Sequence, residues 1–333
     1  DLRRTRDDDD GRLAGGGDDP RREPARELGA RVGIEAGGQP GVAEPERAHR
    51  DDDAEVAARS GSHGAAYATG RADLRPRSGP VTTTTRCAVI GAGSWGTVVA
   101  GLVGARADVV LWGRNPDVVD AVNARHENPV YLAGVALDPA LRATTELEAA
   151  CRGADVVIMA VPSHGFRDVL RRAAPAIAPS AVVVSLTKGI EQATLARPSE
   201  IVAAEVPDLA PGSVAVLTGP NLVREIADGQ PTASVVATPD ATVATRLQDL
   251  FMTSAFRVYT NPDVVGCEIA GATKNVIAIA VGAAAGFGLG DNARAALITR
   301  GLAEMTRLGV ALGGDPLTFA GLAGVGDLVA TCT

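Results

Sequence analysis

The feature that most constrains this chain is a glycine-rich loop between a short apolar run and a helical pattern. The string GAGSWG at 91–96 matches G-x-G-x-x-G and directly follows the apolar run 86–90. A strand, a tight turn and a helix in this order form a dinucleotide-binding unit. Gly91 permits the turn, Gly93 lets the backbone approach a pyrophosphate, and Gly96 lets helix and strand pack closely. The alternative is a glycine-rich turn that serves packing alone.

The segments that follow extend this unit into an α/β fold. Apolar runs typical of buried strands recur with helical segments between them, which predicts a mostly parallel sheet covered on both faces. Two long helical segments follow at 263–285 and 291–308, the second with Asp291 as its N-cap. We therefore expect a Rossmann-type doubly wound sheet over 83–262 and an incomplete all-helical domain over 263–333. The expected strands lie at 86–90, 107–112, 154–163 and 181–186, and in three segments between 213 and 260.

The first 82 residues differ in composition from the rest. Acidic runs, arginines, glycines and prolines leave only eight Leu, Ile, Val and Phe residues among the first 80. So few large apolar side chains cannot offset the conformational entropy lost on folding. We expect a disordered low-complexity leader over 1–82, without the apolar core of a signal peptide. Because the chain begins at Asp1 and not at Met, this leader is open to interpretation as a fragment or a misread upstream translation.

Composition argues against several classes of function. The net charge of −8 argues against a nucleic-acid surface and against an anionic membrane partner. The four cysteines are far apart, which is typical of a reducing cytosol and not of a disulfide framework or zinc site, and the four histidines offer little for metal ligation. The longest apolar run, 276–290, is broken by glycine and too short to span a bilayer. The sequence therefore predicts a cytoplasmic protein with no metal site and no nucleic-acid or membrane partner.

Lysine is almost absent from the chain. Of the 32 lysine and arginine residues, only Lys188 and Lys274 are lysines, and each stands in an apolar or glycine-rich run. An ammonium group can release its proton near neutral pH when it is desolvated, whereas a guanidinium group cannot. We therefore interpret both lysines as functional residues. The alternative is chance placement of two lysines in a long chain.

The end of the second expected strand bears on the choice of cofactor. An NAD site normally offers an acidic side chain to the ribose hydroxyls about 20 residues after the glycine loop. Here the strand ends in LWGRN at 111–115, which contains no acid, and Arg114 is placed to meet a 2′-phosphate. The sequence therefore favours NADPH, with NADH possible. The alternative is that Arg114 is only a solvated charge at a strand end.

Eight motifs of one enzyme family occur in order along the chain. They are GAGSWGT, LWGRNP, AVPSH, SLTKGIE, LTGPNLVREIADGQPTA, GATKNVIAIAVG, NARAALITRGLAEM and GLAGVGDLVATC. Over residues 86–333 the chain thus resembles the bacterial NAD(P)-dependent glycerol-3-phosphate dehydrogenases, of actinobacterial type. The resemblance implies a Rossmann domain, a helical domain and a homodimer in the full-length form. It also implies reversible reduction of dihydroxyacetone phosphate to sn-glycerol 3-phosphate for phospholipid synthesis.

The resemblance implies roles for single residues. Lys274 matches the catalytic acid/base, and the chemistry agrees, because hydride addition to a ketone leaves an alkoxide that needs a proton. Lys188 matches a residue between substrate and nicotinamide, where its charge would stabilise the developing oxyanion. Asp327 matches a residue that orients the catalytic lysine, although it could be an ordinary N-cap. The residues implied for the cofactor are Gly91, Gly93, Ser94, Trp95, Gly96, Arg114, Lys188 and Val223, and those implied for the substrate are Lys188, Gly219, Asn221, Lys274, Asn275, Asp327 and Thr331.

The chain departs from the family pattern at two places. Asn221 stands where many relatives carry Ser, although its amide keeps a hydrogen-bond donor. The family continues with a Ser-Arg-Asn-type run that grips the substrate phosphate, and this chain stops at Thr333 before it, so we expect a truncated chain with weakened substrate binding and exposed apolar helix faces. His164 is not interpreted as catalytic, because a loop histidine is more often a simple hydrogen-bonding residue. The alternative functions are a related dehydrogenase of ketopantoate reductase or 3-hydroxyacid dehydrogenase type, and an inactive NADPH-binding fragment.

Overall fold

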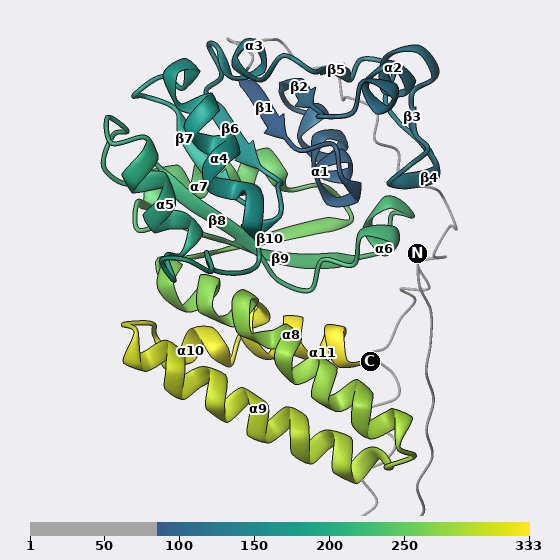
Figure 1. Cartoon of the computed structure of the whole chain (residues 1–333), viewed down its shortest axis with the longest axis vertical. Helices are drawn as coiled ribbons and strands as arrows, with labels where there is room; N and C mark the ends of the chain where they lie inside the picture. Colours follow the sequence, from purple (N-terminus) through teal and green to yellow (C-terminus); the bar gives the residue numbers. More distant parts are fainter. Residues whose placement is uncertain (1–84) are drawn as a thin grey trace, which may run out of the picture. The chain divides into compact units, whose positions relative to one another are not determined.

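The computed structural model describes residues 85–333. The leader expected over 1–82 lies outside the described residues. A sheet flanked by helices forms the first part of the described chain, and helices alone form the last part (Figure 1). The change falls between Asn261 and Val264, where the sequence pattern changes, and the division into two domains at this point remains a prediction.

The sheet has the strand order of a dinucleotide-binding fold with two strands added. From one edge, β5, β2, β1, β6, β7 and β8 follow the order 3-2-1-4-5-6 of doubly wound nucleotide-binding sheets, and β9 and β10 extend it. Every neighbouring pair is parallel except β8 with β9, so the predicted, mostly parallel sheet is confirmed. The strands are β1 (Arg86–Ile90), β2 (Asp108–Trp112), β5 (Arg142–Thr144), β6 (Val156–Met159), β7 (Val182–Ser185), β8 (Val214–Thr218), β9 (Thr232–Ala237) and β10 (Phe256–Asn261).

Helices cover both faces of this sheet. Alternate residues of one strand belong to different hydrophobic clusters: Val89 packs on one face with α1 and α7, while Ala88 and Ile90 pack on the other with α3, α4 and α5. Because both faces are buried, the central strands read as nearly continuous apolar runs instead of alternating ones. The helices of this part are α1 (Ser94–Gly104), α2 (Pro116–Arg125), α3 (Leu147–Cys151), α4 (Ser163–Ala173), α5 (Pro198–Glu205), α6 (Val223–Ala227) and α7 (Ala241–Phe251), with the 3₁₀ helix η1 (Ala174–Ala176).

A small antiparallel hairpin follows α2 and was not expected from the sequence. It consists of β3 (Glu127–Asn128) and β4 (Leu132–Ala136), with Asn128 opposite Leu132. The edge strand β5 was missed as well. These strands are too short, and β4 is too interrupted by glycine, to produce a period-2 pattern that local sequence can reveal.

The last part of the chain is helical, as predicted. It contains α8 (Val264–Gly286), α9 (Asp291–Ala311), α10 (Pro316–Phe319), the π-helix η2 (Leu322–Gly326) and α11 (Asp327–Cys332). Asp263 caps α8 through its side chain, but the N-cap assigned to Asp291 was wrong. Gly290 holds that position with extended backbone, and Asp291 is the first helical residue, paired with Arg294.

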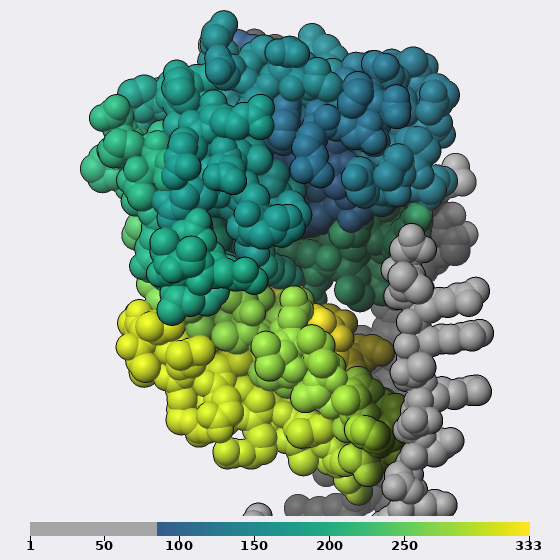
Figure 2. All heavy atoms as spheres, in the orientation of Figure 1, coloured from purple at the N-terminus to yellow at the C-terminus, as the bar shows by residue number. Residues whose placement is uncertain are grey.

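The long helix α8 lies between the sheet and the other helices. It packs against β8 on one side and against α9 and α11 on the others, and Figure 2 shows these helices, green to yellow, in contact with the teal sheet part. Among residues 85–333, α8 is the one helix long and apolar enough to cross a membrane. The apolar run 276–290 had been expected to be too short for this, but the helix begins well before it, at Val264. A core helix passes the same test, and α8 buries Glu268 and Lys274. Its outer side exposes Val276 and Ile279, in line with the expected exposed apolar faces.

Candidate active site

The three glycines of the loop after β1 have different surroundings. Gly91 has φ +122°, and an added Cβ would lie 2.5 Å from the Ala160 carbonyl oxygen. At Gly96 an added Cβ would lie 1.9 Å from the Gly91 carbonyl oxygen, so no side chain fits there. At Gly93, by contrast, it would meet nothing within 4 Å. The first and last glycines are therefore required by the protein backbone itself, and the middle one keeps open space in front of the loop.

That open space belongs to a cleft of about 920 Å³ at the carboxyl ends of the parallel strands. The glycine loop, the ends of β2, β6 and β7, and the start of α4 line it. The cleft lies where the chain leaves β1 in one direction to β2 and later returns on the other side to β6, which is the usual ligand site of a doubly wound sheet. All eight residues predicted for the cofactor line this cleft: Gly91, Gly93, Ser94, Trp95, Gly96, Arg114, Lys188 and Val223.

The start of α1 offers unpaired backbone donors to this cleft. Among the described residues, the N–H groups of residues 93–96 donate no backbone hydrogen bond, whereas Thr97 donates to the Gly93 carbonyl at 3.0 Å. Unpaired donors at the positive end of a helix form an anion site. Together with the space in front of Gly93, they fit the pyrophosphate of a dinucleotide. Arg114 is exposed at the rim of the cleft, and among residues 85–333 no acidic side chain lines this cleft.

Three charged side chains from distant parts of the chain meet beside this cleft. Lys188 follows β7, Lys274 lies on α8, and Asp327 begins α11. One carboxylate oxygen of Asp327 accepts a hydrogen bond from Lys274 Nζ at 2.5 Å, and the other accepts one from Lys188 Nζ at 2.6 Å. Asp327 is 2% exposed and Lys274 7%, so the cluster is largely shielded from water. The alternative reading of Asp327 as a side-chain N-cap is wrong, because its carboxylate makes no capping hydrogen bond.

Each lysine keeps one N–H donor beyond its contacts in the described chain. Lys188 Nζ also donates to the Gly219 carbonyl at 3.0 Å, and Lys274 Nζ donates to Thr331 Oγ1 at 2.7 Å. An ammonium group has three N–H donors, so two are engaged at each lysine. Thr331 in turn donates to the Asp327 carbonyl at 2.6 Å, one helical turn away, which confirms that these two residues share a face.

Burial changes the protonation of Lys188. Removal from water is the largest effect and lowers the pKa of Lys188, the nearby Lys274 side chain lowers it as well, and the Asp327 carboxylate opposes both; together they bring the pKa from 10.5 to about 8. Lys188 therefore loses its charge in the mildly alkaline range of pH.

The other predicted residues differ in their placement. Asn221 lines the cleft, and its Nδ2 donates to Ser234 Oγ at 3.2 Å while its Oδ1 is buried without a partner among the described residues. Asn275 is exposed on α8, and its side chain makes no hydrogen bond to any of the described residues. His164 lies in the first turn of α4 and not in a loop, and it lines the cleft.

Two buried polar groups, one beside the glycine loop and one on α8, were not predicted from the sequence. Asn128 in the β3–β4 hairpin bonds to the glycine loop, and Tyr131 of the same hairpin lines the cleft. On α8, Glu268 is buried and accepts hydrogen bonds from Arg197 Nη1 at 2.7 Å and from the backbone and hydroxyl of Ser199. Burial raises the pKa of the Glu268 carboxyl, and these bonds oppose the shift. No local motif marks either group, since the Ala92, Thr97, Arg197 and Ser199 partners are 31 to 71 positions away along the chain.

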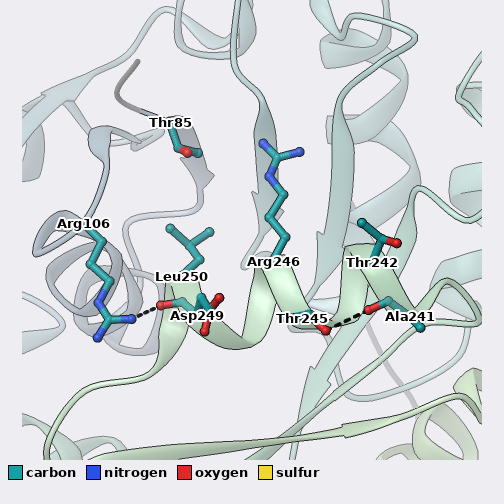
Figure 3. Close-up of a pocket in the computed structure, with 8 residues that line it drawn as sticks. All are labelled: Thr85, Arg106, Ala241, Thr242, Thr245, Arg246, Asp249 and Leu250. Atoms are coloured by element: carbon teal, nitrogen blue, oxygen red, sulfur yellow. Dashed lines mark hydrogen bonds between the residues drawn. The ribbon is translucent and has the colours of Figure 1, made fainter. Parts of the chain in front are cut away.

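A second cavity of about 810 Å³ lies at the opposite end of the sheet (Figure 3). It is bounded by α7, Arg106 and Thr85, next to the amino end of β1, and Arg106 donates a hydrogen bond to the Asp249 carbonyl. No residue predicted for cofactor or substrate lines this cavity. The cleft at the carboxyl ends of the strands is therefore the candidate active site.

Comparisons with known proteins relate most of the described residues to one enzyme family. Residues 86–244 match the family model described as NAD-dependent glycerol-3-phosphate dehydrogenase N-terminus, and residues 263–333 match the model of its C-terminus. A glycerol-3-phosphate dehydrogenase [NAD(P)+] from Thermobifida fusca is 56% identical over 251 residues, which cover 75% of this chain and 74% of the relative. Its counterpart from Streptomyces coelicolor is 56% identical over 249 residues, covering 74% of each chain. The crystal structure of glycerol-3-phosphate dehydrogenase from Coxiella burnetii is 41% identical with a TM-score of 0.70, covering 75% of this chain and 76% of that chain.

Proposed function

Because this chain belongs to the NAD-dependent glycerol-3-phosphate dehydrogenase family, we propose that the Lys188–Asp327–Lys274 cluster performs the acid–base chemistry of that enzyme. The reaction is NAD(P)-dependent and interconverts dihydroxyacetone phosphate and sn-glycerol 3-phosphate. In the direction of reduction it would supply the glycerol backbone of phospholipids. The observation that carries this proposal is the buried carboxylate shared by two lysines at the edge of the cleft.

The chain's part in cofactor binding follows from the glycine loop. The N–H groups of residues 93–96 receive the pyrophosphate, because they are unpaired and stand at the positive end of α1. The nicotinamide, when reduced and bound, supplies a hydride to the carbonyl carbon of the substrate. Arg114 favours NADPH over NADH, because a guanidinium group binds a phosphate with two donors. In the described part of the chain, no carboxylate lines the cleft to bind a free ribose hydroxyl.

Lys274 supplies the proton of the reaction. As the carbonyl carbon gains a hydride, the electron pair of the C=O bond moves to the oxygen, which takes a proton from the Lys274 ammonium group. The resulting amine regains a proton from solvent. In the reverse direction the neutral amine accepts the hydroxyl proton of the alcohol. The third N–H donor of Lys274, which the described chain does not engage, is the one available for this transfer.

Asp327 and Lys188 prepare the site for an anionic substrate. With both lysines protonated, the cluster carries two positive charges and one negative charge, so a net charge of about +1 faces the developing oxyanion. Asp327 holds both amines at fixed positions, and the Gly219 carbonyl gives Lys188 a second anchor. Gly219, Asn221, Asn275 and Thr331 are the further substrate contacts in this proposal.

The test compares Lys274→Met with Thr273→Val in the whole chain. Methionine keeps the length of the side chain without its proton, so kcat for reduction of dihydroxyacetone phosphate should fall about 10²- to 10⁴-fold while NADPH binding is retained. Thr273 is the neighbouring residue on α8, and its hydroxyl bonds only to the Ile269 carbonyl of its own helix at 2.7 Å, so its replacement should leave kcat within about twofold. Normal turnover in Lys274→Met would remove this lysine from the mechanism.

We further propose a cytoplasmic homodimer as the working form. Val276 and Ile279 on α8 and Phe287 just after it are exposed apolar side chains, and they support burial of this surface against another polypeptide. Light scattering on the purified protein tests this point, because a mass equal to that of one chain across the micromolar range would contradict it.

A further inference from the structure

Asn128 connects the cofactor loop to the hairpin that follows α2. It is 0% exposed, and its Nδ2 donates to the Ala92 carbonyl at 3.0 Å and to Thr97 Oγ1 at 2.8 Å. Its Oδ1 accepts from the Tyr131 N–H at 3.1 Å. A carbonyl can only accept and a backbone N–H can only donate, so these partners determine which end of the amide faces the loop. Every hydrogen-bonding atom of this side chain is engaged.

The bond to Ala92 has a consequence for the next residue. In a trans peptide unit the C=O and N–H groups point in opposite directions, and the described residues contain no cis peptide. Because the Ala92 carbonyl is held toward Asn128, in the interior, the N–H of Gly93 points away from Asn128. Gly93 lines the cleft and has open space in front of it. The Asn128 amide thus sets the direction of an N–H donor at the pyrophosphate position.

We propose that Asn128 is a positioning residue for the dinucleotide: through Ala92 it orients the Gly93 N–H toward the pyrophosphate, and through Tyr131 it holds the hairpin wall of the cleft. This inference rests on the proposed placement of the cofactor. Without the Asn128 amide, the Ala92 peptide unit is free to rotate, and the buried Thr97 hydroxyl loses its donor. Rotation turns the Gly93 N–H away and brings a carbonyl oxygen toward the phosphates, which repels them.

The chain offers a matched control in Asn123 on α2. Its side chain also spans two backbone groups, donating to the Ala143 carbonyl at 2.9 Å and accepting from the Ala143 N–H at 2.8 Å. It makes no hydrogen bond to the glycine loop and does not line the cleft. A variant at Asn123 therefore shows the effect of losing the two hydrogen bonds of an asparagine side chain at a position away from the cofactor loop.

The experiment measures NADPH binding to the whole chain without turnover. The chain contains two tryptophans, Trp95 and Trp112, and both line the cleft, so quenching of their fluorescence reports occupancy. Asn128→Ala and the isosteric Asn128→Asp, which cannot donate to the Ala92 carbonyl, should each raise the Kd for NADPH about tenfold. Asn123→Ala should leave the Kd within about twofold. Adenosine 2′-monophosphate lacks the pyrophosphate and should bind to all variants as to the wild type.

The outcomes separate this inference from the proposed function. An unchanged Kd for NADPH in both Asn128 variants, with Gly93→Ala still abolishing binding, would overturn the role of Asn128 and leave the cofactor site in place. Equal weakening of NADPH and of adenosine 2′-monophosphate would also overturn it, because the residue would then be only structural. If Gly93→Ala binds NADPH normally, the proposed placement of the cofactor is itself wrong. The isosteric Asp variant keeps the test informative if Asn128→Ala fails to fold.

Discussion

Replacement of Asp327 by Asn should destabilise the protein in a manner that depends on pH. The change keeps the shape of the side chain and removes the one negative charge that two lysines share. Removing one partner of a buried ion pair costs about 3–5 kcal/mol. The lower end applies here, because the Lys188 side chain is 24% exposed and water screens part of its charge. We expect a loss of about 3 kcal/mol at pH 7, which corresponds to a fall in Tm of roughly 6–12 °C.

The pH dependence follows from Lys188. Its folded-state pKa of about 8 is lower than the 10.5 of the unfolded chain, so at pH 7 the amine is protonated in both states and its bond to Asp327 is fully charged. Above pH 8 the folded protein loses this proton, and the charged part of the bond disappears from the wild type as well. The difference between wild type and Asp327→Asn should therefore shrink to about half, roughly 1.5 kcal/mol, at pH 9.5, because one of the two ion pairs that the replacement removes is already lost from the wild type.

Urea unfolding at pH 7 and pH 9.5 measures both values, with Glu205→Gln as the control. Glu205 also accepts hydrogen bonds from two basic side chains, Arg167 and Arg171. Guanidinium groups do not titrate in this range, so the destabilisation by Glu205→Gln should be the same at both pH values. An Asp327→Asn effect that is equal at pH 7 and pH 9.5 would show that Lys188 does not titrate as argued, and a loss below about 1 kcal/mol at pH 7 would contradict the buried geometry itself.

Three further outcomes are expected. The value of kcat/KM for reduction should fall as pH rises through about 8, because Lys188 loses its charge there. Lys188→Arg should lower the rate but abolish this pH dependence, since a guanidinium group stays charged. If the variant still loses activity above pH 8, another group is responsible for the fall. Gly96→Ala should lower the free energy of unfolding in urea by about 1–3 kcal/mol, because its Cβ would lie 1.9 Å from the Gly91 carbonyl oxygen. The control Gly104→Ala, whose Cβ would lie 4.0 Å from its nearest neighbour, should not destabilise the protein. Arg114→Ala should raise KM for NADPH about tenfold in steady-state assays and leave KM for NADH within about twofold, and an equal rise for both cofactors would refute its role at the 2′-phosphate.

Local sequence patterns predicted a large share of the fold. The buried strands and the long helices α8 and α9 were found because each produces a periodic or continuous apolar run over its own residues. The glycine loop was found because its spacing is local: within six consecutive positions, Gly91 and Gly96 are required by backbone geometry, and Gly93 keeps the space in front of the loop open. The hairpin β3–β4 and the strand β5 were missed, since two to five residues carry no detectable period.

The sequence by itself determined the strand–loop–helix unit, the layered fold and the residue types needed for a proton transfer, because these depend on neighbours along the chain. Only the tertiary structure decided which groups meet. It brought Lys188, Lys274 and Asp327 together over separations of 53 and 139 positions along the chain. It also showed that Asp327, a possible N-cap by sequence, is the counter-ion that both lysines share. It also placed Asn128 under the glycine loop. Such contacts depend on how strands and helices pack in three dimensions, and packing distances between remote segments leave no periodic trace in the sequence.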